Sequence, residues 1–145
     1  MSKAFVLGHA DAKRWVVHPP QDPYGDGYVY TIVTQLFDDG MIASTSAKMD
    51  GVFAGSQATT LSAFVQTLAD DWRGWDGIRT WRALDHELAL DARHDGRGHV
   101  SLGVTLRASV PSWDDTAWSA RVVFVVEAGE EMTRLAVDLR QALRP

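Results

Sequence analysis

The sequence alternates between apolar and polar side chains over residues 100–107, and this period of two constrains the fold more than any other feature of the chain. Alternation of this kind places every apolar group on one face of an extended strand. The apolar positions are Val100, Leu102, Val104 and Leu106. The pattern therefore predicts a strand that turns one face toward a hydrophobic core.

A second candidate strand, over residues 84–92, precedes this one. Its apolar positions, predicted to point inward, are Leu84, Leu88, Leu90 and Ala92, whereas Glu87, Asp91 and Arg93 are predicted to point outward. The step Asp95-Gly96 lies between the two strands. Because glycine accepts the positive φ that a tight turn requires, the two runs are predicted to form a hairpin.

Further strands are predicted on both sides of this hairpin. The segment 118–126 is apolar on both faces, which indicates a central strand covered on both sides. Residues 28–37 and 41–49 flank Asp38-Asp39-Gly40 and predict another hairpin. Weaker strands are expected at residues 4–7 and 15–18, and three prolines indicate a loop over residues 18–27.

Two amphipathic helices complete the pattern. The first apolar stripe consists of Leu61, Phe64, Val65, Leu68 and Trp72, with Thr59 or Thr60 as cap and Gly74 just past the end. The second stripe consists of Met132, Leu135, Ala136, Leu139 and Leu143. Acidic residues occupy its first turn and arginines its last, which suits the helix dipole.

These elements predict an α+β fold in a single globular domain over residues 1–145. We expect a curved, mainly antiparallel sheet of six to eight strands, with the two helices packed on it. One helix follows each strand–turn–strand unit, so the chain divides into two loosely equivalent halves of strands followed by a helix.

Composition narrows the class of protein. The chain is 46% hydrophobic, which supplies a core, and it has no cysteine, which excludes disulfides and thiolate metal sites. The longest apolar run, residues 122–126, is far too short to span a bilayer. A net charge of −5 argues against nucleic-acid backbones and anionic lipid as partners. A soluble, cytoplasmic protein is expected.

The turn between the paired strands carries His94, Asp95 and His99. Two imidazoles and a carboxylate in one neighbourhood suggest a metal site or an acid–base pair. The alternative is that Asp95 builds the turn and the histidines form a solvated pair. Two histidines are too few for a structural zinc site, so the turn interpretation is favoured, and neither a catalytic residue nor a cofactor is assigned.

The segment Asp70–Trp81 is rich in indoles and carboxylates. Trp72 continues the helical stripe and Trp81 opens a strand, so both are predicted to be buried, whereas Trp75 is predicted to be partly exposed and available to a partner. The candidate partner-binding residues are Asp70, Asp71, Trp75 and Asp76. Carboxylate doublets elsewhere are Asp38-Asp39, Asp114-Asp115 and Glu130-Glu131, and they would add negative potential for a basic partner.

Several blocks of the chain resemble one family of small bacterial proteins of unknown function, some of which carry the label WapI-type immunity protein. The blocks are residues 22–27, Asp70–Gly77, Trp81, Leu84, residues 87–90, His94–Val100, residues 118–121 and residues 127–130. The resemblance implies bacterial origin, a cytoplasmic location and neutralisation of a toxin by stoichiometric binding. It implies no catalytic residue.

Two functions therefore compete. The first is a non-enzymatic, immunity-like factor that masks a toxin through an acidic surface with an aromatic anchor. The second is a small-ligand-binding protein or enzyme with a sheet-lined pocket, in which His94, His99 or loop carboxylates lie at the mouth. The lack of cysteine and of a catalytic motif favours the first.

Overall fold

The computed structural model describes residues 3–9, 12–22, 25, 29–50, 60–111 and 113–144, with the side chain of Asp50 left aside. Along the chain, four strands are followed by a helix, and four further strands by a second helix. This order matches the two halves that the sequence pattern predicts. Part of the expected loop over residues 18–27, together with Tyr28 and the alternative cap Thr59, lies outside the described residues.

The first four strands form one antiparallel sheet in chain order. They are β1 (Phe5–Gly8), β2 (Arg14–Val17), β3 (Val29–Asp38) and β4 (Met41–Asp50). The predicted hairpin around Gly40 is confirmed: Asp38 pairs with Met41, and Gly40 has a φ of +71°. The early strands are likewise confirmed, with Phe5 opposite Val17.

The next four strands form a second antiparallel sheet, again in chain order. They are β5 (Ile78–Arg82), β6 (Leu88–His94), β7 (His99–Arg107) and β8 (Ser119–Glu127). The predicted hairpin at Asp95-Gly96 is confirmed, because His94 pairs with Val100 and Gly96 has a φ of +75°. The alternating apolar residues of β7 are all buried.

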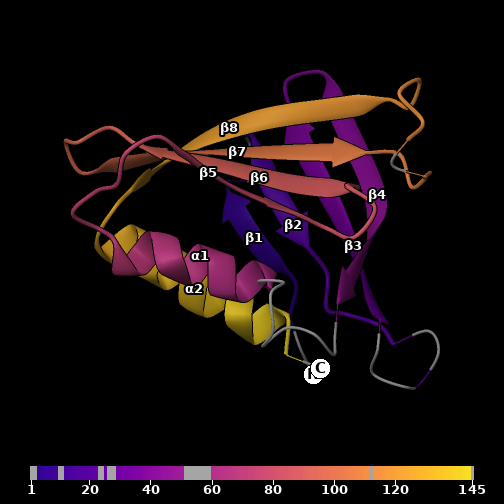
Figure 1. Cartoon of the computed structure of the whole chain (residues 1–145), viewed down its shortest axis with the longest axis horizontal. Helices are drawn as coiled ribbons and strands as arrows, with labels where there is room; N and C mark the ends of the chain where they lie inside the picture. The colour runs from indigo at the N-terminus through magenta and orange to yellow at the C-terminus, as the bar shows by residue number, and fades with distance from the viewer. Residues whose placement is uncertain are drawn as a thin grey trace.

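Helices α1 (Leu61–Asp70) and α2 (Glu130–Ala142) lie where the two apolar stripes predict them. Thr60 caps α1, because its hydroxyl accepts the N–H of Ala63 at 3.1 Å. In Figure 1 the two helices lie beneath the β5–β8 sheet, and the β1–β4 sheet crosses beside them.

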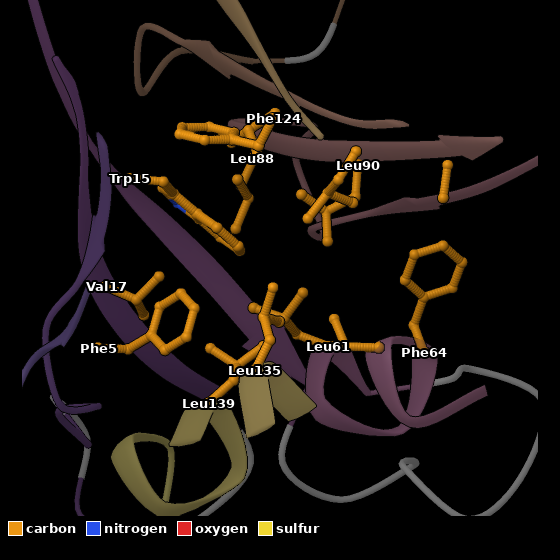
Figure 2. Close-up of a cluster of buried hydrophobic side chains, with 14 of the residues drawn as sticks. Phe5, Trp15, Val17, Leu61, Phe64, Leu88, Leu90, Phe124, Leu135 and Leu139 are labelled. Carbon is orange, nitrogen blue, oxygen red and sulfur yellow. The ribbon is translucent and has the colours of Figure 1, made fainter. Parts of the chain in front are cut away.

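The core lies between these three layers (Figure 2). Each layer contributes large buried side chains: Phe5, Trp15 and Val17 from the first sheet, Leu88, Leu90 and Phe124 from the second, and Leu61, Leu135 and Leu139 from the helices. Burial of this apolar surface is the main favourable term in folding. The indole of Trp15 is fully buried, and its N–H donates to the Thr34 hydroxyl at 2.8 Å, which satisfies its only polar atom.

Two parts of the predicted fold need correction. The structure has two four-stranded sheets rather than one curved sheet of six to eight strands. Strand β8 lies at the edge of its sheet, not at the centre, and Val125 is 63% exposed. An apolar face therefore need not be a buried face, because β-branched residues also suit exposed strand positions.

The strand predicted over residues 84–92 begins later than expected, at Leu88. Leu84 is exposed in the turn before it, whereas Glu87, predicted to point outward, is fully buried. The Glu87 carboxylate accepts the backbone N–H groups of Lys48 and Asp85, both at 3.1 Å. Burial of a carboxylate is tolerated here because its oxygens are hydrogen-bonded.

Candidate functional site

Three connections gather at one end of the β5–β8 sheet: α1–β5, β6–β7 and β8–α2 (Figure 1). Hydrogen bonds join them, since His94 Nε2 lies 2.9 Å from the Trp72 carbonyl and the Ala128 N–H donates to the Gly98 carbonyl at 2.8 Å. We call residues 70–79, 94–99 and 127–131 the acidic end. It holds seven carboxylates, all on exposed residues, against three arginines, a formal charge of −4.

The α1–β5 connection is shaped by a glycine. The Gly74 N–H donates to the Asp71 carbonyl at 2.9 Å, and Gly74 has a φ of +127°. A Cβ at this position would lie 3.2 Å from His94 Nδ1. Gly74 thus permits both the left-handed backbone and the close approach of the imidazole.

Both nitrogens of His94 are engaged. Nδ1 accepts the backbone N–H of Gly96 at 2.9 Å, so Nε2 carries the proton and donates to the Trp72 carbonyl. Within the described residues, no group of three or more His, Cys, Asp or Glu is arranged to hold a metal ion. His94 thus helps to build the turn, but it does not form the expected pair with His99, since the strand register places His94 opposite Val100 and His99 opposite Glu127.

The β6–β7 turn is built by Asp95, as the sequence predicts. Its Oδ1 accepts the backbone N–H groups of Arg97 at 2.6 Å and His99 at 3.1 Å. These bonds, from Arg97 first and His99 second, lower the pKa of the Asp95 carboxyl. Asp95 Oδ2 also lies 3.7 Å from His99 Nδ1, so the histidine is oriented toward the turn.

The indoles differ from the prediction. Trp72 does not extend the buried stripe, because α1 ends at Asp70 and the Trp72 side chain is 52% exposed. Trp81 is only half-buried, although it packs against the core. Trp75 is half-buried, in agreement with partial exposure, but it also packs against the core.

Trp75 is held by two neighbours. The Arg79 guanidinium lies 4.7 Å from its ring centroid, and the His94 ring meets it edge to face at 5.4 Å. Its indole N–H is buried with no hydrogen-bond partner among the described residues. The exposed indole of this segment is therefore Trp72, over which Arg73 lies at 5.0 Å.

The three predicted aspartates are all exposed but differ in their contacts. Asp70 Oδ1 accepts from the Gln66 amide at 2.9 Å, and Asp71 forms a 2.7 Å ion pair with Arg79. No hydrogen bond or ion pair to the Asp76 side chain occurs within the described residues. The structure thus places Asp70 at the end of α1 and the other three predicted residues in the connection that follows, with the Asp71 carboxylate paired with Arg79.

Glu127 has a role that the sequence pattern does not predict. Its carboxylate accepts the N–H groups of Gly129 at 2.7 Å and Glu131 at 3.1 Å, while the Glu131 side chain accepts the Glu127 N–H at 3.2 Å. This reciprocal pair caps α2. The bonds, from the Glu131 N–H above all and then Gly129, lower the pKa of the Glu127 carboxyl. The sequence signal for this cap is the spacing of the two acidic residues, Glu127 and Glu131, four positions apart at the start of the helix.

Together, these elements define an α+β protein of two antiparallel sheets and two helices, with a hydrogen-bonded, acidic surface at one end. Residues 11–145 match a family model described as a family of unknown function, DUF6228, and the chain belongs to that family. The match carries no link to WapI-type immunity proteins. Searches of curated proteins and of solved structures found no significant match. No described helix is long and apolar enough to cross a membrane.

Proposed function

We propose that this chain is a non-enzymatic, immunity-like binding protein that masks a basic protein, such as a bacterial toxin, in the cytoplasm. The observation that carries the proposal is the position of Trp72, an exposed indole among the carboxylates of the acidic end. Tryptophan is enriched at interface hot spots, because one side chain buries a large area at little entropic cost.

The charge of the acidic end supports a basic partner. Its exposed carboxylates outnumber its arginines by four, and the whole chain carries a net charge of −5. A field of one sign at one end of a small protein steers oppositely charged partners and excludes anionic ones. Asp70, Asp71 and Asp76 would act in this way, and Asp76 is the least compensated of the three.

The rigidity of the surface supports binding rather than catalysis. Backbone N–H groups of this surface donate hydrogen bonds to the side chains of Asp95, Glu127 and His94. These bonds hold the shape of the surface before a partner binds. Preorganised surfaces lose less conformational entropy on association. Trp75 helps to hold this surface in place, because its ring contacts the Arg79 guanidinium and the His94 ring.

The competing proposal of a small-ligand pocket with His94 at its mouth is less well supported. Both ring nitrogens of His94 are occupied by backbone groups, so they are not available to a ligand without breaking the turn. His99 is exposed and oriented by Asp95. This end of the molecule therefore offers a surface for a protein rather than a site for acid–base chemistry.

The genes beside this one should include one for a basic protein, and a neighbourhood without such a gene would contradict the toxin proposal. Co-expression with that protein then tests binding. The wild-type chain should form a 1:1 complex in size-exclusion chromatography and protect cells from that protein. Replacing Asp70, Asp71 and Asp76 by Asn should abolish both effects, whereas Asn at Asp38, Asp39 and Asp138, exposed acids outside the acidic end, should preserve them. Equal behaviour of the two triple variants would reject the acidic end as the binding surface.

A further inference from the structure

A hollow of about 470 Å³ lies at the opposite end of the β5–β8 sheet from the acidic end. Its floor is on the outer face of the sheet, because Ala89 and Thr105 alternate with the buried residues Leu88, Leu90, Val104 and Leu106. In Figure 1 this end is where β5 turns into β6 and where β7 leaves toward β8.

Cationic and polar side chains line this hollow. Arg82 comes from the end of β5, His86 from the β5–β6 turn and Arg107 from the end of β7. Thr105 and Ser119 add hydroxyl groups, and the small side chain of Ala89 leaves space above the sheet. Asp115 is the one carboxylate in the lining, so the fixed charge of the hollow is +1 with His86 neutral.

Two of the three cationic groups have no partner among the residues that the structure describes. Within the described residues, neither the Arg82 guanidinium nor the His86 imidazole has a hydrogen bond or an ion pair. By contrast, Arg121 on the same face forms a 2.7 Å ion pair with Asp91, and Arg79 pairs with Asp71. Unpaired cations that converge on one hollow leave their donors open to an anion.

Arg107 is positioned by the β7–β8 connection. Its Nη2 donates to the backbone carbonyl of Asp114. That connection is itself held by Asp114 Oδ1, which accepts both the N–H and the hydroxyl of Thr116. The guanidinium is thus held in place by a carbonyl group, and the nearby Asp114 carboxylate offsets part of its charge, so Arg82 and His86 are the less compensated cations of the hollow.

His86 occupies an unfavourable backbone conformation. Its φ is +63°, the only positive value among described residues other than glycine. Glycine would take this conformation without strain, so the histidine is present at a cost to stability. Strained residues of this kind concentrate at functional sites. The turn is held in place from below by the buried carboxylate of Glu87.

We propose that this hollow is a binding site for an oxyanion, the phosphate or carboxylate group of a small molecule. Guanidinium groups match the geometry of both oxyanions, and two of them with an imidazole and two hydroxyls supply donors on several sides. The flat floor of the sheet admits a small ligand. Asp115 at the rim would face a hydroxyl or cationic part of the same molecule.

Amide chemical-shift titrations with inorganic phosphate and with malonate test this proposal and distinguish the two anions. At least one of the two anions should give saturable shifts at residues 82–89, 105–107 and 119. The anion that saturates at the lower concentration shows whether the site prefers a phosphate or a carboxylate group. Shifts that grow linearly up to high concentration for both anions, or that spread over all surface arginines, overturn it.

Variants sharpen the same experiment. Arg82→Met should weaken the saturating anion about tenfold or more, since it removes charge-assisted hydrogen bonds. Arg93→Met is the matched control, because Arg93 is exposed in β6 near the far end of the sheet, and it should change nothing. His86→Gly should weaken the anion while the protein stays folded, because it relieves the strained backbone. Unchanged affinity in Arg82→Met also contradicts the site.

Discussion

The Glu87 carboxylate accepts the backbone N–H of Lys48 at 3.1 Å, and this bond joins the turn before β6 to strand β4 of the other sheet. A parallel contact runs between backbones, where the Leu84 N–H donates to the Lys48 carbonyl at 3.1 Å. On the surface, Lys48 Nζ forms a 2.9 Å ion pair with Asp85. One buried acid and its neighbours therefore contribute hydrogen bonds that join the two sheets.

Replacing Glu87 by Ala should lower the free energy of unfolding by about 2–4 kcal/mol, because it removes a fully buried side chain and leaves the part-buried N–H groups of Lys48 and Asp85 without these acceptors. Glu87→Gln should lose less, since its amide oxygen can still accept. Urea denaturation measures both, with Glu130→Ala as an exposed control. A loss in Glu87→Ala no larger than in the control would contradict this role.

Gly74→Ala should destabilise the protein by about 1–3 kcal/mol, because the new Cβ would enter a left-handed backbone and press on His94. Gly77→Ala is the matched control: its φ is +76°, but a Cβ there meets nothing within 4 Å. The difference between the two, measured by thermal unfolding, isolates the contact with His94. Equal losses of stability in the two variants would show that the His94 ring moves aside at no cost in free energy.

Gly96→Val should cost about 1–2 kcal/mol, since a β-branched residue is disfavoured at the observed φ of +75° even though the space around Gly96 is open. Gly96→Asn should retain most of the stability, because Asn tolerates the left-handed region. Because a Cβ at Gly96 meets no other atom, chemical denaturation of the two variants measures the cost of the backbone conformation alone. An unchanged midpoint in Gly96→Val would mean that the turn rearranges.

Trp75→Ala should lower the free energy of unfolding by about 1.5–3 kcal/mol, because the indole packs against the core and against Arg79 and His94. Trp72→Ala should change it by less than about 1 kcal/mol, since that side chain is half exposed. Urea unfolding followed by circular dichroism compares them. A larger loss of unfolding free energy in Trp72→Ala than in Trp75→Ala would show that Trp72 is buried, as the helical stripe predicts.

Acid should destabilise the fold through Asp95, Asp114 and Glu127, whose pKa values are all lowered by hydrogen bonds to the carboxylate: from Arg97 in Asp95, Thr116 in Asp114 and Glu131 in Glu127. A carboxyl that is more acidic when folded contributes stability above its unfolded pKa, and that contribution is lost as pH falls through the folded value. The melting temperature should therefore decrease below about pH 4.5, the ordinary pKa of a glutamate.

Glu127→Gln provides the check on this dependence. The variant should melt below the wild type at pH 7, where the charged cap is lost, and the difference should shrink as the pH falls and Glu127 of the wild type becomes protonated. Asp138→Asn, an exposed acid on α2, serves as the control. A constant difference across the pH range would assign the loss to something other than charge.

Much of the fold could be predicted because periodicity and turn residues are local signals. The hairpins at Gly40 and Gly96 and both helices were found in this way. The division into two sheets could not be predicted, because no local signal in the sequence shows that β4 and β5 lie in different sheets. Helix α1 ends before Trp72, and the N–H of its C-cap residue Asp71 donates to the Thr67 carbonyl. The apolar stripe therefore predicts a longer buried face than the helix has.

The candidate site was predicted in composition but not in geometry. The sequence identified Asp70, Asp71, Trp75 and Asp76, yet the exposed indole is Trp72, and Asp71 is paired with Arg79. The meeting of three connections at one end of the sheet follows from strand order, which no single segment encodes. The basic hollow could not be predicted for the same reason, since its lining comes from four strands and the connections beside them.

The most direct test of the proposed function is the association rate with the basic protein encoded beside the gene, measured by stopped flow as salt is raised. We expect the rate to fall steeply with ionic strength, since exposed charges are screened beyond about 8–10 Å at physiological salt. Asn at Asp70, Asp71 and Asp76 should flatten this dependence, and Trp72→Ala or Trp75→Ala should mainly raise the dissociation rate. A rate that does not depend on salt or on these substitutions would contradict the account.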